Sequence, residues 1–172
     1  RLPAAVVLVQ HRAPAAAPDA FTALLAARSP LPVIQLAEAD RLRPAVVHVV
    51  PGGHTAQFDP DGRVMLIPTR GHRQADPLFA SAAAVYGPRV IAAVLSGRLD
   101  DGAAGVRHVK GAGGRVLAQD EATCQAYGMP AAAIATGCVD FVLPLPVLAD
   151  AITALVMAPG AAGLMRVALP PW

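Results

Sequence analysis

The 172-residue chain has few charged side chains, few lysines and few serines, and these shortages argue against several classes of structure and function. Only 15% of the residues are charged and 55% are hydrophobic, so the chain can bury enough apolar surface to fold and is not disordered. Basic residues exceed acidic ones by only 14 − 12 = 2 and form no run, which argues against nucleic-acid binding. No apolar stretch approaches the roughly 20 residues that membrane insertion of a helix needs. The only serines are Ser29, Ser81 and Ser96, so few side chains are available as a serine nucleophile.

Cysteine is almost as scarce. Cys124 and Cys138 have neither the spacing of a zinc site nor the number needed for a disulfide framework. We expect both to be buried thiols in a reducing cytoplasm. The apolar residues 1–10 lack the basic region of a secretory signal, which also favours a cytoplasmic location. The sequence predicts no metal site and no cofactor, since no His/Cys cluster and no cofactor motif is present.

Apolar β-branched runs alternate along the chain with alanine-rich stretches of helical pattern. Strands are predicted at 5–9, 31–35, 46–50, 90–95, 115–118 and 140–143, with a hairpin at 58–67 that turns at 59–62. Helices are predicted at 18–28, 76–86, 102–110, 131–135 and 147–157, with Pro77 first in the second helix. These strand–helix–strand units predict a doubly wound α/β fold with a mainly parallel sheet, flanking helices and an antiparallel hairpin at one edge.

Polar clusters follow three of the predicted strands, at 10–12, 96–102 and 119–121. Ligands of such sheets bind beyond the carboxyl ends of the strands. His11 directly follows the first strand and is well placed as a general base, the alternative being a loop histidine that caps a helix or faces water. The other histidines are weaker candidates: His48 is expected to be packed within a strand, His108 to lie in a helix, and His54 and His72 to lie in loops.

Two adjacent carboxylates, Asp100 and Asp101, precede the helix predicted at 102–110. Either can accept hydrogen bonds from the free N–H groups of a helix N-terminus, and only one is needed for that. The other is free to meet His11, whose tautomer it would set and whose imidazolium it would stabilise. The pair lacks a nucleophile, because Ser96 has no G-x-S-x-G turn around it and the two cysteines are expected to be structural.

Four ordered stretches of the chain match motifs of one enzyme family. They are residues 7–11 (VLVQH), 95–105 (LSGRLDDGAAG), 113–124 (GGRVLAQDEATC) and 127–134 (YGMPAAAI). Over roughly residues 4–155 the chain thus resembles the catalytic domain of the CheB-type protein-glutamate methylesterases of chemotaxis. The resemblance implies a hydrolase of signal transduction that cleaves glutamyl methyl esters on chemoreceptors, releasing methanol, and in many members also deamidates receptor glutamines. It places the catalytic residues at His11 and Asp101, and the oxyanion loop at Gly97 and Arg98.

Two departures from the family's pattern bear on activity. The family's nucleophilic serine lies in an Ala-Ser-x-Gly-Gly turn one βα unit before the histidine strand, and residues 1–172 contain no such turn. We therefore expect the serine upstream of Arg1, with an N-terminally incomplete catalytic domain at 1–158 and a Pro/Gly/Ala-rich tail at 159–172. The family also usually has Met-Gly where this chain has Arg98 and Leu99, and the loss of glycine is expected to alter that turn.

These expectations leave three hypotheses of different kinds. The leading one is a Ser-His-Asp methylesterase that acts on a methylated chemoreceptor or a similar protein, with a receiver domain in cis or in trans as regulatory partner. The alternative is a catalytically inactive homologue that serves as a binding or scaffold module in signalling. A nucleotide-binding domain is a third and weaker hypothesis, because no G-x-G-x-x-G follows a strand.

Overall fold

The computed structural model describes residues 2–14, 19–69 and 71–158. Its strands are β1 (Val6–Leu8), β2 (Val33–Gln35), β3 (Val47–Val49), β4 (His54–Phe58), β5 (Val64–Pro68), β6 (Ile91–Val94), β7 (Arg115–Gln119) and β8 (Phe141–Leu143). Its helices are α1 (Ala20–Ala26), α2 (Ala75–Tyr86), α3 (Ala103–Gly111), α4 (Gly128–Ala135) and α5 (Leu145–Met157), with a short 3-10 helix η1 (Gly87–Arg89) after α2. Each predicted strand and helix is present, with its ends shifted by a few residues. The tail predicted at 159–172 lies outside the described residues.

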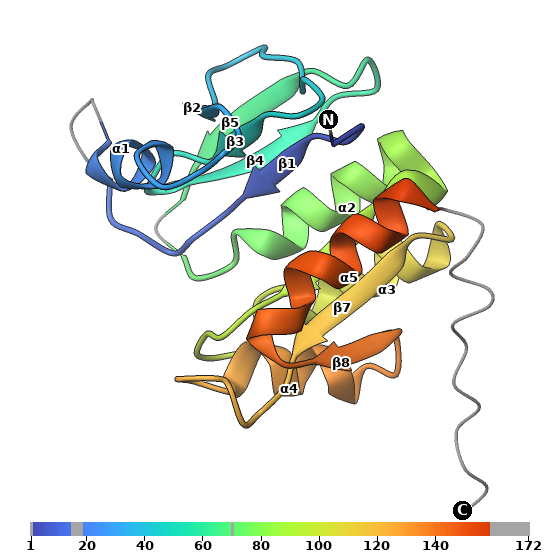
Figure 1. Ribbon diagram of the computed structural model, residues 1–172. Helices are drawn as coiled ribbons and strands as arrows, with labels where there is room; N and C mark the ends of the chain where they lie inside the picture. The colour runs from blue at the N-terminus through green and yellow to red at the C-terminus, as the bar shows by residue number, and fades with distance from the viewer. Residues whose placement is uncertain (1, 15–18, 70, 159–172) are drawn as a thin grey trace, which may run out of the picture.

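Six of these strands form two separate three-stranded parallel sheets. The first has the order β1-β3-β2 and the second the order β6-β7-β8, while β4 and β5 pair with each other as the predicted antiparallel hairpin. Figure 1 shows the first sheet and the hairpin in the upper half of the molecule and the second sheet in the lower half. The mainly parallel α/β architecture is confirmed, and it is interrupted between the edge strands β1 and β6.

Helix α2 joins the two halves. It contacts β4 on one side and α3 on the other, and Figure 1 shows it running between them. Leu78 belongs to the core of the first half with Phe58, whereas Ala83 belongs to the core of the second half with Val94. Helix α5 covers the second sheet by packing on Leu117 of β7. The position of α2 therefore fixes the two sheets relative to each other.

Three local predictions are corrected. Pro77 is the third residue of α2 and not the first, because the helix begins at Ala75; a proline is tolerated there since first-turn N–H groups have no partner within the helix. His54 opens β4 and is not a loop residue, because the tight turn before it ends at Gly53. Cys124 and Cys138 are half-buried and not buried, since both lie in connections between elements.

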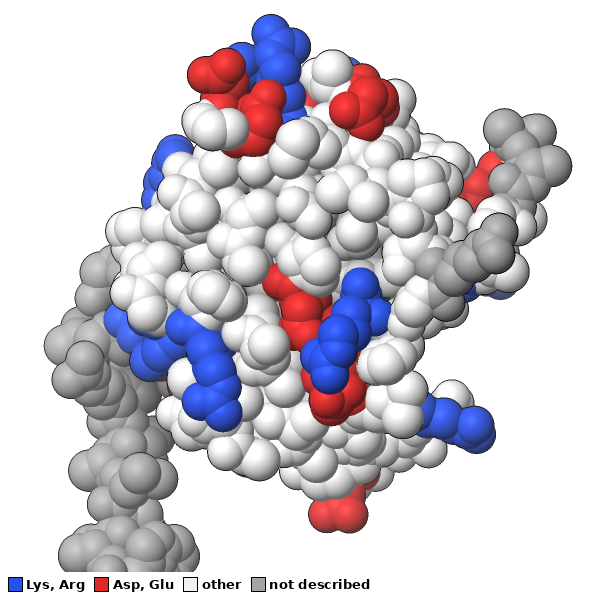
Figure 2. Space-filling view, turned by 180° about the vertical axis from the view of Figure 1, so that it is seen from behind, with Lys and Arg blue, Asp and Glu red and all other residues white. Residues whose placement is uncertain are grey.

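Membrane-spanning helices and metal-binding clusters are both missing from the part of the chain that the structure describes. Within the described ranges, no helix combines the length and the apolar character that crossing a bilayer demands. The same residues contain no group of three or more His, Cys, Asp and Glu side chains arranged to hold a metal ion. Figure 2 shows the face turned away from the viewer in Figure 1, where acidic and basic side chains are intermixed without a broad area of one sign.

Candidate active site

His11 and Asp101 meet at the carboxyl ends of their strands. His11 follows β1 and Asp101 follows β6, and Nε2 of the histidine lies 2.7 Å from Oδ2 of the aspartate. The histidine side chain is 36% exposed and that of the aspartate 1%. The pair inferred from the sequence is thus assembled from two different sheets, with one member buried and the other open to solvent.

Asp101 is anchored by the N-terminus of α2. Its Oδ2 accepts hydrogen bonds from the N–H groups of Gln74 and Ala75 at 2.8 Å each, and its Oδ1 accepts from Asp76 N at 3.0 Å. The expectation that one of the two adjacent carboxylates caps α3 is wrong, because Asp101 accepts from the start of α2 and Asp100 pairs with Arg73. The N-cap of α3 is Gly102, and no side chain makes a capping hydrogen bond there.

These contacts decide the charge of Asp101. Burial alone raises the pKa of its carboxyl, but three N–H donors and the His11 ring outweigh that effect and hold the pKa below its ordinary value. The positive end of the α2 dipole favours the same ionised form. Asp101 is therefore a carboxylate near neutral pH, as a partner for a protonated histidine must be.

A second carboxylate locks the two helices at this point. Oδ1 of Asp76, in the first turn of α2, accepts a hydrogen bond from Gly105 N of α3 at 2.8 Å. The start of α2 in turn donates to Asp101, which precedes α3, so hydrogen bonds run both ways between the two helix starts. A Cβ at Gly105 would lie only 2.7 Å from Cβ of Phe79, which means that the close approach depends on glycine. Arg73 then bridges Asp76 and Asp100 at 2.7 and 2.8 Å on the surface.

The backbone after β1 is fixed by Arg12. Its guanidinium makes two hydrogen bonds to Asp19, of 2.7 and 2.6 Å, a third to Val50 O at 3.1 Å, and stacks over the Phe21 ring at 4.3 Å. The hydrogen bond from Arg12 holds the pKa of Asp19 below its ordinary value despite burial. Arg12 thereby orients the chain immediately next to His11, a role that its place in the polar cluster did not reveal.

The two nitrogens of the His11 ring have different tasks available to them. Nε2 faces a carboxylate, which accepts the proton of that nitrogen. Nδ1 then carries the lone pair and can accept a proton. Among the described residues, no hydroxyl or thiol makes a hydrogen bond to this ring. The arrangement is one in which a histidine can accept a proton at Nδ1 while a carboxylate holds its other ring nitrogen.

The nucleophile candidates in the sequence are engaged elsewhere. The Ser96 hydroxyl accepts hydrogen bonds from Gln125 N and Ala126 N, at 3.1 and 3.0 Å. Burial and the nearby Asp120 raise the pKa of the Cys124 thiol, which opposes formation of a thiolate. The surroundings of Ser96 and Cys124 therefore favour a structural role for each side chain over a role as nucleophile.

The remaining histidines also have local structural partners. His48 is buried as predicted, with Nδ1 3.2 Å from Val6 O and Nε2 accepting from Arg43 N, and burial lowers the pKa of its ring. Nδ1 of His54 lies 3.0 Å from Gly52 O. His72 is on the surface, 3.7 Å from Asp100, and His108 lies in α3 as predicted. None of them makes a hydrogen bond to His11 or Asp101 within the described part of the chain.

The loop between β6 and Asp101 lies beside the pair. It contains Gly97 and Arg98, and Leu99 follows with a left-handed φ of 65°, a conformation that favours glycine. Leu99 adopts this strained conformation with its side chain 62% exposed. In the described residues no acceptor binds the N–H of Arg98.

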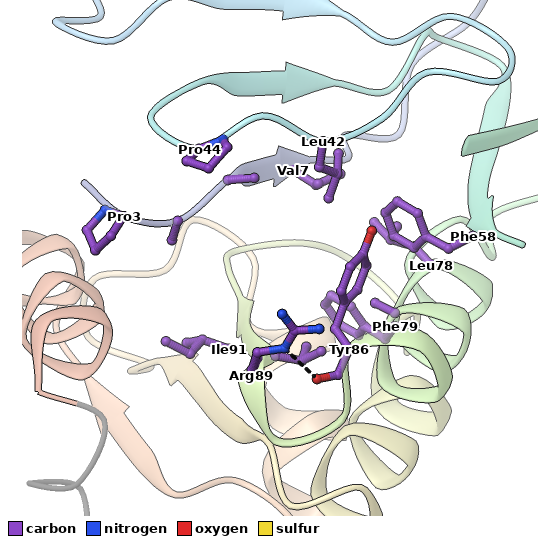
Figure 3. A pocket seen from close by; sticks show the side chains of 14 residues that line it. Pro3, Val7, Leu42, Pro44, Phe58, Leu78, Phe79, Tyr86, Arg89 and Ile91 are labelled. Carbon is purple, nitrogen blue, oxygen red and sulfur yellow. Dashed lines mark hydrogen bonds between the residues drawn. The ribbon is translucent and has the colours of Figure 1, made fainter. Parts of the chain in front are cut away.

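A cavity of about 410 Å³ separates the two parallel sheets. Figure 3 shows Val7 of β1 and Ile91 of β6 on opposite sides of it, with Phe79 and Tyr86 of α2 along one flank. The lining is mainly apolar; it also includes Leu42, Pro44, Phe58, Leu78, Ala82 and Val90. We call this cavity the slot.

The backbones of both bordering strands are open toward the slot. Val50 N donates to Leu8 O, so the backbone N–H and C=O groups of the even-numbered residues of β1 point toward β3. The backbone groups of Val7 point the other way, toward the slot. Arg115 N donates to Val90 O, so by the same alternation the backbone N–H and C=O groups of Ile91 in β6 point away from β7 and toward the slot. The carboxyl ends of both strands meet at the His11–Asp101 pair, and one parallel strand in the slot would end beside that pair.

Comparison with known proteins gives consistent results. The family model for the CheB methylesterase domain matches residues 1–152. The protein-glutamate methylesterase/protein-glutamine glutaminase of Moorella thermoacetica is 40% identical over 92% of this chain, and that of Methanosarcina mazei, numbered 2, is 36% identical over 90%. The chain spans 39% and 45% of the lengths of these two relatives. The crystal structure of the Thermotoga maritima CheB methylesterase catalytic domain is similar with a TM-score of 0.78 and 30% identity, covering 90% of this chain and 85% of that one.

Proposed function

Because the chain belongs to the CheB methylesterase family, we propose that it supplies the base and the acid of a serine hydrolase that cleaves glutamyl methyl esters on chemoreceptors. The observation that carries the proposal is the 2.7 Å contact between His11 and a buried, anchored Asp101. A histidine held in this way is poised to take a proton from a hydroxyl and to return it to a leaving group.

The reaction proceeds in two halves. A serine hydroxyl attacks the ester carbonyl carbon while its proton passes to Nδ1 of His11, and Asp101 stabilises the resulting imidazolium. The tetrahedral intermediate expels methoxide, which takes the proton from His11 and leaves as methanol. Water then attacks the acyl-enzyme with His11 again as base, and collapse releases the glutamate carboxyl and the serine. With a glutamine substrate the first leaving group is ammonia, which would account for the second activity in the relatives' names.

The nucleophile comes from outside residues 1–172, and the slot offers a path for it. A strand parallel to β1 and β6 would satisfy the open backbone groups of both and bury its side chains in the apolar lining. Its carboxyl end would lie next to His11, where the serine has to be. This placement explains why a base and its acid are complete here without a nucleophile in contact with them.

The oxyanion of the intermediate requires an N–H donor near Asp101 and His11. We assign this role to the loop of Gly97 and Arg98, because the Arg98 N–H has no acceptor among the described residues. The substitution of Arg98 for the family's usual methionine leaves this backbone donor in place. The exposed guanidinium next to it would favour an acidic surface on the substrate protein.

Partners and location follow from the same family role. We propose a methylated chemoreceptor as substrate, a receiver domain in cis or in trans as regulator, and the cytoplasm as the place of action. The competing hypothesis, an inactive scaffold, draws on the absence of a hydroxyl in contact with His11 within the described part of the chain. The two hypotheses differ in whether His11 matters for turnover.

The test measures methanol release from methylated chemoreceptor membranes by the protein expressed from its own gene. We expect His11→Ala to abolish turnover and Ser29→Ala, remote from the pair, to leave it unchanged. Turnover that survives His11→Ala would exclude the mechanism. An unmodified protein without any activity, which still binds receptor membranes, would support the scaffold instead.

A further inference from the structure

A buried amide fastens the loop before Asp101 to the segment after β7. Gln119, at the end of β7, is 1% exposed. Its Oε1 accepts a hydrogen bond from Ser96 N at 2.8 Å, and its Nε2 donates to Thr123 O at 2.8 Å. A glutamine suits this place because one planar group is both acceptor and donor. The side chain thus ties the end of β6 to the loop at 120–124.

The Ser96 hydroxyl makes a second connection to the same segment. It accepts from Gln125 N and Ala126 N, and it donates to Ala126 O at 3.3 Å. The scarce serine is therefore used as a clamp that binds three backbone groups at once. Gln119 binds the main-chain N–H of Ser96, and the hydroxyl of Ser96 binds the backbone of residues 125 and 126.

Backbone contacts extend this clamp to the predicted oxyanion loop. Gly97 N donates to Ala126 O at 2.9 Å, and Met129 N donates to Gly97 O at 2.8 Å. A Cβ on Gly128 would lie 2.8 Å from Leu99 N, so α4 begins directly against the loop. The loop is consequently fixed on both sides of Arg98, and the strained φ of Leu99 is held by its surroundings.

We propose that Gln119 is a positioning residue for catalysis, which acts through Ser96 to keep the Arg98 N–H directed at the oxyanion. The proposal rests on the function assigned above, since it needs an oxyanion to stabilise. Neither Gln119 nor Ser96 touches the reacting atoms. Their effect is on the geometry of the donor, and a donor displaced from the transition state loses most of its value.

The experiment compares variants of the protein expressed from its own gene. Gln119→Met keeps the length of the side chain and removes its hydrogen bonds, while Ser96→Ala removes the hydroxyl. Ser96→Thr restores a hydroxyl, and Ser29→Ala is the matched control in a connection far from the site. We measure kcat and KM for ester hydrolysis, and hydrogen exchange of the amides of residues 97–99 by NMR.

We expect Gln119→Met and Ser96→Ala to lower kcat by about 100-fold, which is close to the decrease in kcat caused by removing one oxyanion donor. KM should be unchanged. Exchange at residues 97–99 should be faster in both, and Ser96→Thr should keep the unmodified kcat. If Gln119→Met does not fold, Ser96→Ala and Ser96→Thr decide the question by themselves.

Two results would contradict the proposal, and they are distinct from failure of the assigned function. Unchanged kcat in both clamp variants, while His11→Ala is inactive, overturns the positioning role and leaves the hydrolase intact. Equal losses in kcat for Ser29→Ala would also overturn it, because the effect would then not be local. If His11→Ala keeps full activity, the assigned function fails, and the exchange rates still decide whether the clamp holds the loop.

Discussion

The two members of the pair are held in opposite ways. Asp101 is 1% exposed and accepts from three N–H groups, those of the N-cap residue Gln74 and the first two residues of α2, in addition to the histidine ring. His11 is 36% exposed, and among residues 2–14, 19–69 and 71–158 its ring makes one hydrogen bond, the one to Asp101. The aspartate is therefore positioned by the packing of the fold, whereas the orientation of the histidine ring depends on the aspartate.

Because of this difference, the two residues of one contact are expected to contribute differently to the stability of the protein and similarly to its catalytic activity. Loss of Asp101 leaves buried donors without acceptors, and it also releases the ring of His11. Loss of His11 removes a side chain from a solvent-facing position and leaves the cradle of Asp101 intact. Variants of the two residues should consequently agree in activity and differ in stability.

The largest effect is expected from Asp101→Asn. An amide cannot balance the imidazolium charge and can favour the wrong tautomer, so we expect kcat to fall by roughly 10⁴-fold, as in the triad of serine proteases. The matched control is Asp100→Asn, which alters a neighbouring carboxylate that is 50% exposed and paired with Arg73. Methanol release distinguishes the two, and a similar loss in both variants would mean that Asp101 has no special part in the pair.

The comparison is sharpest in the stability of Asp101→Ala and His11→Ala. We expect Asp101→Ala to lower the free energy of unfolding by about 3 kcal/mol or more, since buried N–H groups lose a charged acceptor. His11→Ala should change it by about 0.5 kcal/mol or less, as an exposed side chain does. Urea denaturation followed by circular dichroism measures both. Equal losses would show that the pair is held by the histidine as much as by α2.

A smaller effect is expected at the contact between α2 and α3. Gly105→Ala places a methyl group 2.7 Å from Cβ of Phe79 and 3.1 Å from Cα of Asp76, which should destabilise the protein by about 1–3 kcal/mol. Gly111→Ala is the control, because nothing lies within 4 Å of a Cβ at that last residue of α3. We expect it to be neutral or slightly stabilising. Thermal unfolding of the two variants should therefore shift in different directions or by clearly different amounts.

The same contrast explains how much could be predicted from the sequence. The strands and the place of His11 follow from local patterns, since an apolar β-branched run ends just before the histidine. The capping role of Asp101 does not, because its donors lie 25 to 27 residues earlier, and a local rule assigns it to the helix that follows. Gln119 lies in one of the predicted polar clusters, but its contact with Ser96 was not predicted, because that partner lies 23 residues away. The His11–Asp101 contact could be inferred because both residues follow strand ends, whereas the backbone partners of these two buried side chains have no such signature in a single sequence.

The smallest effect is expected in the dependence of stability on pH. The folded-state pKa of Asp101 lies below the ordinary value of about 3.9. Such a group contributes stability that is present above its unfolded pKa and is lost as the pH falls through its folded pKa. The unmodified protein should therefore lose free energy of unfolding between about pH 5 and pH 2. Asp101→Asn should lose less over that range, and should still lose some, because Asp19 titrates with a lowered pKa beside Arg12. Urea denaturation across this pH range measures the difference, and parallel curves would mean that Asp101 carries no charge that folding favours.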